Sequence, residues 1–361
     1  DECAAIPRLH QNRGRTIPTH CGHGAHHGGI SKGIHMLTRR QTLTYGLAGF
    51  TPLSSHAQKT SDEYPTKQIS LVVSYSPGGN VDLRARMLGV ATAKTLGVPV
   101  IVENKPGANG NIGHEYVARS TPDGYTLVLA TMGPMAVSSF VYPKLGFDPE
   151  ASFQPIVLIE KAPMVLVTRA DKPFKTLKEL IEFGQKNPNQ LTFGNAGSGS
   201  AHHLAAELFM QSVGIQGLSV PYKGGSQAAT ALLSGEIDAL FEQSYAAVPS
   251  VQTGKVRALA VTAEKRLTSL PSIPTMIELG YPKVVVHNWL GLAAPKQTPT
   301  HVIQKLNQVF NLALAQPDIR DKITTPGNIV GSGTPDEFKT FILSERRKWA
   351  PIVKSLNIKP E

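Results

Sequence analysis

Short apolar runs alternate with amphipathic stretches along the chain from Gln58 onward. The apolar runs have the length and composition of buried strands, and the amphipathic stretches repeat apolar residues at helical spacing. The predicted strands are Ile69–Ser74, Val100–Glu103, Tyr125–Ala130, Met164–Thr168, Leu191–Phe193, Ile237–Phe241, Val256–Thr262 and Val284–His287. The predicted helices are Asp82–Leu96, Asn111–Ser120, Leu177–Asn187, Ala201–Val213, Gln227–Leu233 and Val302–Leu314. Strands that alternate with helices predict an α/β fold with mainly parallel sheets covered on both faces.

The length of the patterned region predicts two lobes, because about 300 residues are more than one sheet comfortably holds. Two of the helices show clear apolar faces. The first carries Leu83, Met87, Val90 and Ala91 on one side, and the helix from Ala201 carries Leu204, Ala205, Leu208 and Phe209 on its predicted buried side.

The first 57 residues are predicted to lie outside the fold. Residues 1–35 are rich in Gly, His and Pro and lack apolar periodicity, so we interpret them as sequence upstream of the true start or as a disordered segment. The histidines among them could also bind metal adventitiously. From Met36 the chain resembles an export signal, with a twin arginine at Arg39 and Arg40 and a cleavage site after Ala57. An ordinary secretory signal is the alternative, and the apolar part of the signal is too short to span a membrane.

Charge and cysteine content narrow the classes of function. The formal net charge is +10, of which residues 1–57 contribute +4. The remaining positive field suits an anionic ligand, although many proteins that bind no anion share it. No cluster of Lys and Arg interleaves with aromatic residues, so we expect no nucleic-acid partner. Cys3 and Cys21 both precede Met36, so the mature chain would have neither thiol catalysis nor cysteine-bound metal.

Three glycine-containing turns join a predicted strand to a predicted helix, at Tyr75–Asp82, Asn195–His203 and Pro221–Ser226. Such turns let a ligand approach the backbone closely, and the N–H groups at a helix start attract anions. In open α/β sheets, ligands bind at the carboxyl ends of the strands, where all three turns are expected. The turns therefore indicate a site for a carboxylate, although any one of them could simply connect a strand to a helix without binding a ligand.

Single side chains near the turns allow two interpretations each. Asp82 could contact a ligand or only complement the helix dipole, and Lys223 could pair with ligand charge or stay solvated. His202 and His203 point about 100° apart in a helix, so we expect one to face a cleft and the other to pack or cap. Glu242, directly after an apolar strand, could receive a polar or cationic part of the ligand.

Enzyme signatures are missing from the sequence. There is no Gly-x-Ser-x-Gly elbow, no phosphate-binding loop, no dinucleotide fingerprint and no His-Glu-x-x-His motif. The histidines after residue 57 show no metal-ligand spacing, so we expect no metal, no cofactor and no catalytic residue. A hydrolase that uses Ser198 or Ser200 with His202 remains the enzymatic alternative.

Motifs spread along the chain are similar to those of one protein family. The stretches that carry the resemblance are Tyr64-Pro65, Ser76-Pro77-Gly78-Gly79-x-x-Asp82, Val102 to Gly113, Pro122 to Leu127, Gly197 to Leu204, Pro221 to Gly225, Gly235 to Asp238, Lys255 to Thr262 and Trp289-x-Gly291-Leu292. Over Tyr64 to Ile358 the sequence resembles the Bug family, the solute-binding receptors of tripartite tricarboxylate transporters. The order and spacing of the motifs, more than any one of them, make the resemblance specific.

The resemblance implies a periplasmic two-lobe binding protein of the Venus flytrap kind, type II-like, with a hinge between the lobes. Lobe 1 would comprise residues 58–163 plus 284–361, and lobe 2 residues 164–283. A small organic carboxylate would be gripped between the lobes and passed to membrane transporter subunits by a monomeric receptor. A receptor that senses a carboxylate without a cognate transporter is the alternative.

The turns and the resemblance together indicate the site residues Tyr75, Ser76, Gly78, Gly79, Asp82, Thr131, Ser198, Gly199, Ser200, His202, Tyr222, Lys223, Gly224 and Glu242. The sequence departs from the family pattern at two places. Phe241-Glu242-Gln243-Ser244 stands where Phe-Asp-Asn and a small residue or Pro are common, and Ser76 stands where Pro or an aromatic residue is usual. These departures leave the identity of the carboxylate open.

Overall fold

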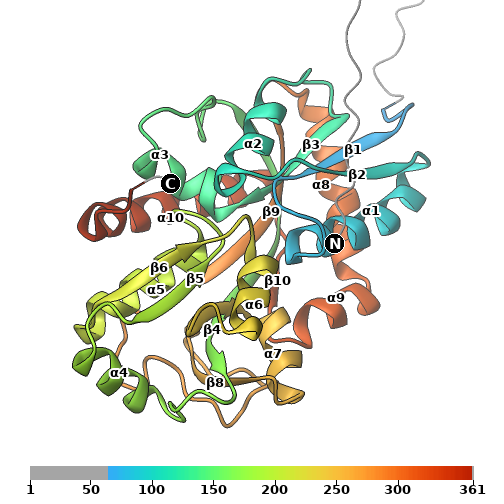
Figure 1. The fold of residues 1–361 in the computed structure, drawn as a ribbon. Coiled ribbons are helices and arrows are strands. Elements are labelled where there is room, and N and C mark those ends of the chain that lie inside the picture. Colours follow the sequence, from blue (N-terminus) through green and yellow to red (C-terminus); the bar gives the residue numbers. More distant parts are fainter. Residues whose placement is uncertain (1–63, 360–361) are drawn as a thin grey trace, which may run out of the picture. The chain divides into compact units, whose positions relative to one another are not determined.

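The computed structural model describes residues 64–359 (Figure 1). The predicted export signal and the cleavage site at Ala57 lie outside these residues. One strand, β4 (Phe153–Arg169), belongs to both halves of the sheet system. Its first part, up to Pro163, pairs with β9 (His287–Pro295), and its second part, from Met164, pairs with β7 (Ala239–Gln243) and β8 (Val256–Val261).

The first half of the sheet has the strand order β2-β1-β3-β9-β4. Its further strands are β1 (Ile69–Val73), β2 (Val100–Asn104), β3 (Thr126–Thr131) and β10 (Ile329–Val330). Its helices and single turns are α1 (Asn80–Leu96), η1 (Ala108–Gly110), α2 (Asn111–Ala118), η2 (Gly133–Val137), α3 (Ser138–Val141), α8 (Thr300–Ala315), α9 (Pro317–Thr324) and α10 (Pro335–Leu356).

The second half has the order β4-β7-β5-β6, with β8 also paired to β4. It adds strands β5 (Leu191–Asn195) and β6 (Gly217–Pro221) and helices α4 (Leu177–Lys186), α5 (Ala201–Val213), α6 (Gly225–Ser234) and α7 (Ser244–Gln252). In Figure 1, β9 and β4 run between β1–β3 and β5–β6. The described residues therefore form a two-lobed α/β fold.

Alternation along the strands explains why each sheet is covered on both faces. In β1, Leu71 and Val73 belong to the apolar cluster under α1 and α8, whereas Val72 belongs to the cluster on the α2 side. In β4, Leu166 and Val165 face opposite clusters in the same way. Successive strand residues point to opposite faces, so a continuous apolar run is the mark of such a doubly covered sheet.

The strand directions are more mixed than the alternating pattern suggests. The predicted parallel core is present in each half, with β1 parallel to β2 and β3, and β5 parallel to β6 and β7. Strands β4 and β9 run antiparallel to their neighbours. A loop without a helix precedes β9, and the short helices η2 and α3 with a loop precede β4. Neither strand therefore follows the long crossover helix that joins parallel strands.

Several predicted elements need correction. The strand expected at Val284–His287 begins only at His287 and continues to Pro295 as β9, and the first part of β4, α7 and α10 were not predicted. The apolar face of α1 is also not its buried face, because Leu83 is 47% and Val90 78% exposed. The predicted buried face of α5 is confirmed, since Leu204 and Phe209 are fully buried.

Buried polar side chains and a close contact between α1 and β2 determine which face of α1 is turned inward. Arg84 and Thr92 point inward, and Arg84 forms a buried ion pair with Glu160 of β4 at 2.8 Å. A Cβ at Gly89 would lie 3.4 Å from the Val100 carbonyl oxygen, so a glycine there lets the helix lie close to β2. No helix within residues 64–359 has both the length and the apolar content that crossing a bilayer requires.

Candidate functional site

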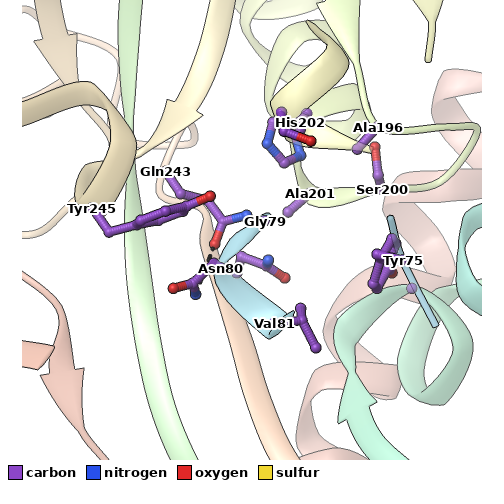
Figure 2. A pocket seen from close by; sticks show the side chains of 14 residues that line it. Tyr75, Gly79, Asn80, Val81, Ala196, Ser200, Ala201, His202, Gln243 and Tyr245 are labelled. Carbon is purple, nitrogen blue, oxygen red and sulfur yellow. Dashed lines mark hydrogen bonds between the residues drawn. The ribbon is translucent and has the colours of Figure 1, made fainter. Parts of the chain in front are cut away.

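A small cavity lies where the two lobes meet (Figure 2). Its volume is about 40 Å³, room for about three waters at roughly 10–15 Å³ each. The first turns of four helices line it: Gly79, Asn80 and Val81 at α1, Ser200, Ala201 and His202 at α5, Gly225 and Ser226 at α6, and Gln243 and Tyr245 at α7. Tyr75, Gly133, Ala196 and Asn288 complete the lining.

The electrostatics of the cavity come mainly from these helix starts. At a helix start the first N–H groups lack intrahelical partners, and the dipole is positive there. In α1, α6 and α7 no side chain caps this end. Within the part of the chain that the structure describes, no Lys or Arg lines the cavity. The cavity is therefore suited to an anion held by backbone N–H groups rather than by Lys or Arg.

The turn before α1 is held from behind by Asp82. Its carboxylate accepts hydrogen bonds from the Gly78 N–H at 3.0 Å, from Arg86 at 2.9 and 3.0 Å, and from Asn104 at 3.0 Å. Burial alone would raise the pKa of Asp82, but these hydrogen bonds outweigh burial and hold the pKa below its usual range. Asp82 thus shapes the turn, and of the turn's predicted residues only Tyr75 and Gly79 line the cavity.

Tyr75 is fixed by two partners. Its hydroxyl lies 3.2 Å from the Thr131 hydroxyl and donates to the Asn109 carbonyl oxygen at 3.2 Å. Burial raises the pKa of Tyr75 to about 12, so the phenol is neutral and can donate. Thr131 does not line the cavity and instead positions Tyr75.

The turn before α5 makes contact with lobe 1. The Ser198 carbonyl oxygen accepts from the Asn109 amide at 3.0 Å, and a Cβ at Gly199 would come 3.1 Å from Val137. Ser200 lines the cavity, and its hydroxyl accepts the His203 N–H at 3.3 Å as the helix cap. Ser198 and Gly199 build the turn and its contact with lobe 1, outside the cavity lining.

His202 lines the cavity and Glu242 lies behind it. Nε2 of His202 is 3.6 Å from Oε1 of Glu242, which also accepts the Gln243 N–H at 2.8 Å. His203 points elsewhere, with Nδ1 accepting the Gly199 N–H at 3.1 Å and Nε2 3.4 Å from Glu207. The hydrolase geometry is not formed in the described residues, because Ser200 bonds to the His203 backbone and Nε2 of His202 faces Glu242.

The third predicted turn lines the cavity only with its last two residues, Gly225 and Ser226. Tyr222 bonds to Glu236 at 3.2 Å, and the side chain of Lys223 is exposed while its N–H donates to Gln227 at 3.1 Å. Neither residue lines the cavity, nor does Gly224.

Four lining residues lie outside the three predicted turns: Gly133, Gln243, Tyr245 and Asn288. Asn80 donates to Glu160 and, across the lobes, to Gln243 at 3.4 Å (Figure 2). Burial first, and Glu242 second, raise the pKa of Tyr245, so it too is neutral. Asn80 lies inside the first predicted turn, although it was not named as a site residue, whereas Gln243 and Tyr245 belong to the start of α7, a helix that was not predicted.

Comparison with known proteins places the chain in a family. A model described as tripartite tricarboxylate transporter family receptor matches residues 84–358. BugT of Bordetella pertussis is 34% identical over 304 residues, which cover 84% of this chain and 93% of BugT. The chain belongs to this receptor family. The resemblance to the Bug family is therefore confirmed.

Solved structures agree with the fold. R. palustris Rpa4515 with adipate aligns with a TM-score of 0.80 at 31% identity, over 83% of this receptor and 100% of that chain. MatC from Rhodopseudomonas palustris with bound malate aligns with a TM-score of 0.77 at 32% identity, over 80% of this receptor and 100% of that chain. The expected two-lobe α/β fold is thus confirmed, and the family is one of periplasmic solute-binding receptors rather than enzymes.

Proposed function

We propose that this receptor captures a small organic carboxylate in the cavity between its lobes and delivers it to the membrane subunits of a tripartite tricarboxylate-type transporter. The observation that carries the proposal is the convergence of four helix starts on one cavity that no Lys or Arg lines within residues 64–359. The related proteins with bound adipate and malate support the same class of ligand.

The proposed lobes are residues 58–163 with 284–361, and residues 164–283. The change of pairing along β4, from β9 up to Pro163 to β7 and β8 from Met164, supports this division. Hydrogen bonds between the lobes, from Asn109 to Ser198 and from Asn80 to Gln243, indicate that the structure is the closed form. Capture would then be closure of the lobes around the carboxylate, which desolvates it against the helix starts.

Two groups of predicted site residues have different proposed roles. Tyr75, Gly79, Ser200 and His202 would contact the ligand, since they line the cavity. The others would hold the turns or form the rim: Ser76, Gly78, Asp82, Thr131, Ser198, Gly199, Tyr222, Lys223, Gly224 and Glu242. We further propose that the receptor acts as a monomer and is exported with cleavage near Ala57.

A thermal-shift screen of residues 58–361 tests the ligand class. Malate, adipate and other small acids are compared with their esters, which lack the charge. A ligand present at about 100 times its dissociation constant adds roughly 2.7 kcal/mol to the free energy of unfolding. Stabilisation by an acid and none by its ester is the expected result. No response to any acid, in protein freed of bound ligand by unfolding and refolding, would contradict the proposal.

Gly79→Asp tests the anion site directly. Gly79 has ordinary backbone angles at the cap of α1, and a Cβ there has space, with its nearest neighbour at 3.8 Å. An aspartate would cap α1 with its own carboxylate and occupy the place of the anion. We expect malate affinity to fall about 100-fold while the fold persists. Gly79→Asn is the matched neutral control, and equal losses in both variants would argue for steric blockage instead.

A further inference from the structure

The pairing of His202 with Glu242 is unusual for a site that receives an anion. Glu242 is 4% exposed and His202 3% exposed; His202 sits at the wall of the cavity and Glu242 lies behind it. Their 3.6 Å separation suits an ion pair but is too long for a hydrogen bond. Nε2 of His202 and Oε2 of Glu242 have no hydrogen-bond partner among the described residues. A buried carboxylate so placed repels a ligand carboxylate unless a positive charge stands between them.

The other ionisable groups around His202 do not supply that charge. Tyr75, after β1, and Tyr245, on α7, are neutral because burial raises the pKa of each. The α6 residues at the ring, Gly225 and Ser226, carry no charge.

Two further pairs of side chains lie near the site. Arg84 of α1 forms an ion pair with Glu160 of β4 at 2.8 Å. On α5 itself, Nδ1 of His203 accepts the Gly199 N–H, and its Nε2 faces Glu207 at 3.4 Å, outside the cavity lining. Among the described residues, Glu242 is therefore the carboxylate without an ion-pair partner that faces His202.

We propose that the receptor binds its carboxylate together with one proton, held on His202 between Glu242 and the ligand. The inference rests on the proposed carboxylate capture and adds the proton as a second ligand. The balance is simple: neutral imidazole, a solvent proton and the ligand anion become an imidazolium flanked by two carboxylates. No covalent bond changes. Glu242 is a positioning residue here, and His202 is the group that meets the ligand.

Proton uptake fixes the sign of the pH dependence. Because one proton enters the complex together with the anion, the affinity falls as the pH rises, by up to about tenfold per pH unit. Simple carboxylic acids have pKa values near about 4, so their own ionisation does not contribute above about pH 6.5.

Calorimetric titrations with malate and with adipate, between about pH 6.5 and 9, test the inference. Each is run in two buffers that differ in ionisation enthalpy, which yields the number of protons taken up. We expect uptake of up to one proton and a matching rise of the dissociation constant with pH. His202→Gln should weaken binding at least about tenfold at the low-pH end and abolish the slope.

The double variant separates charge from structure. In His202→Gln the bare Glu242 still repels the ligand, so adding Glu242→Gln should restore part of the lost affinity. A merely structural pair would instead show no gain of affinity when Glu242→Gln is added to His202→Gln. Glu207→Gln is the matched control, because it removes a carboxylate 3.4 Å from the neighbouring His203 outside the cavity lining, and it should leave the slope unchanged.

The outcomes are distinct. Malate or adipate binding with no proton uptake and a pH-independent dissociation constant overturns the inference and leaves the carboxylate receptor standing. A slope that survives in His202→Gln also overturns it. No binding at any pH of malate, of adipate or of any other acid in the thermal-shift screen contradicts both the inference and the proposed function.

Discussion

Two buried histidines in this receptor occupy opposite kinds of surroundings. His114 in α2 is fully buried in lobe 1, and His202 in α5 is 3% exposed at the wall of the cavity. Both follow a glycine-containing turn and sit near the start of a helix. Burial and position in the helix are nearly the same for the two histidines. Any difference in their protonation must therefore come from the groups that face their ring nitrogens.

His114 faces a backbone carbonyl on one side and aromatic rings on the other. Its Nδ1 lies 2.8 Å from the Gly110 carbonyl oxygen, which can only accept, so Nδ1 carries the proton. Phe147 and Phe153 pack on the ring at centroid distances of 6.1 and 5.8 Å. Nε2 has no partner in the described residues, and burial lowers the pKa of His114 to about 4.

His202 has a carboxylate where His114 has hydrocarbon. Glu242 lies 3.6 Å from its Nε2, and the cavity lies beside the ring. A second proton on His114 would enter an apolar environment, whereas a second proton on His202 would enter the field of a carboxylate. Burial of a histidine therefore says little about its role until the group facing its second nitrogen is known.

Acid unfolding gives the largest expected effect. The unfolded chain binds a proton at His114 near pH 6.5, but the folded protein binds it only near pH 4. Between those values the unfolded state holds more protons, so stability falls as the pH falls, by about 3 kcal/mol in all. In His114→Asn, which retains a donor for Gly110, this part of the loss should vanish. Urea unfolding of ligand-free protein at several pH values measures it.

Carboxylates that titrate in the same range contribute equally to the stability profiles of the wild type and the variant. The difference between the two profiles therefore reports His114 alone. His301→Asn is the matched control, because His301 is exposed and its loss should leave the pH profile unchanged. If wild type and His114→Asn show parallel profiles from pH 7 to 4, His114 is not kept neutral by burial, and the contrast with His202 fails.

A glycine beside each histidine sharpens the contrast. In α2, a Cβ at Gly113 would overlap the Ser74 hydroxyl and come 3.0 Å from the Ser74 Cα, which is backbone and cannot move aside. Gly113→Ala should therefore cost about 1–3 kcal/mol of stability, although alanine favours helices. Urea unfolding at neutral pH measures the cost. A stabilised variant would show that the contact between α2 and β1 is loose.

In α6, the corresponding change should act on binding and not on the fold. A Cβ at Gly225 would lie 3.0 Å from Nε2 of His202, a side-chain atom that can shift. Gly225→Ala should keep stability within about 1 kcal/mol. By turning the ring away from Glu242 it should weaken malate binding about tenfold, or roughly 1.4 kcal/mol. Unchanged affinity would mean that the orientation of His202 does not matter to the ligand.

Much of this arrangement could be predicted from local sequence. Strand-turn-helix order placed the turns that begin α1, α5 and α6, and the pair His202-His203 was expected to divide between cleft and cap. That expectation rests on 3.6 residues per turn, which needs no tertiary information. The structure has His202 at the cavity and His203 bonded to Gly199.

Contacts between distant segments could not be predicted in this way. Asn109 meets Ser198 across the lobes, and Arg84 meets Glu160 beneath α1. These partners also rotate α1 so that Leu83 faces solvent, against its apolar periodicity. A single sequence carries periodicity but not pairing, so buried polar contacts that override periodicity leave no local signal.

Ser74→Ala gives the smallest effect and tests the partners assigned to His114. The Ser74 hydroxyl lies 3.0 Å from Nδ1, but Nδ1 has one proton, and the Gly110 carbonyl oxygen is closer at 2.8 Å. Ser74 is therefore the weaker of two acceptors that share one N–H, and removing its hydroxyl should cost only about 0.5–1 kcal/mol. The low pKa of His114 should persist, because its cause is burial. A loss above about 2 kcal/mol in urea unfolding would make Ser74, and not the Gly110 carbonyl oxygen, the principal partner of Nδ1.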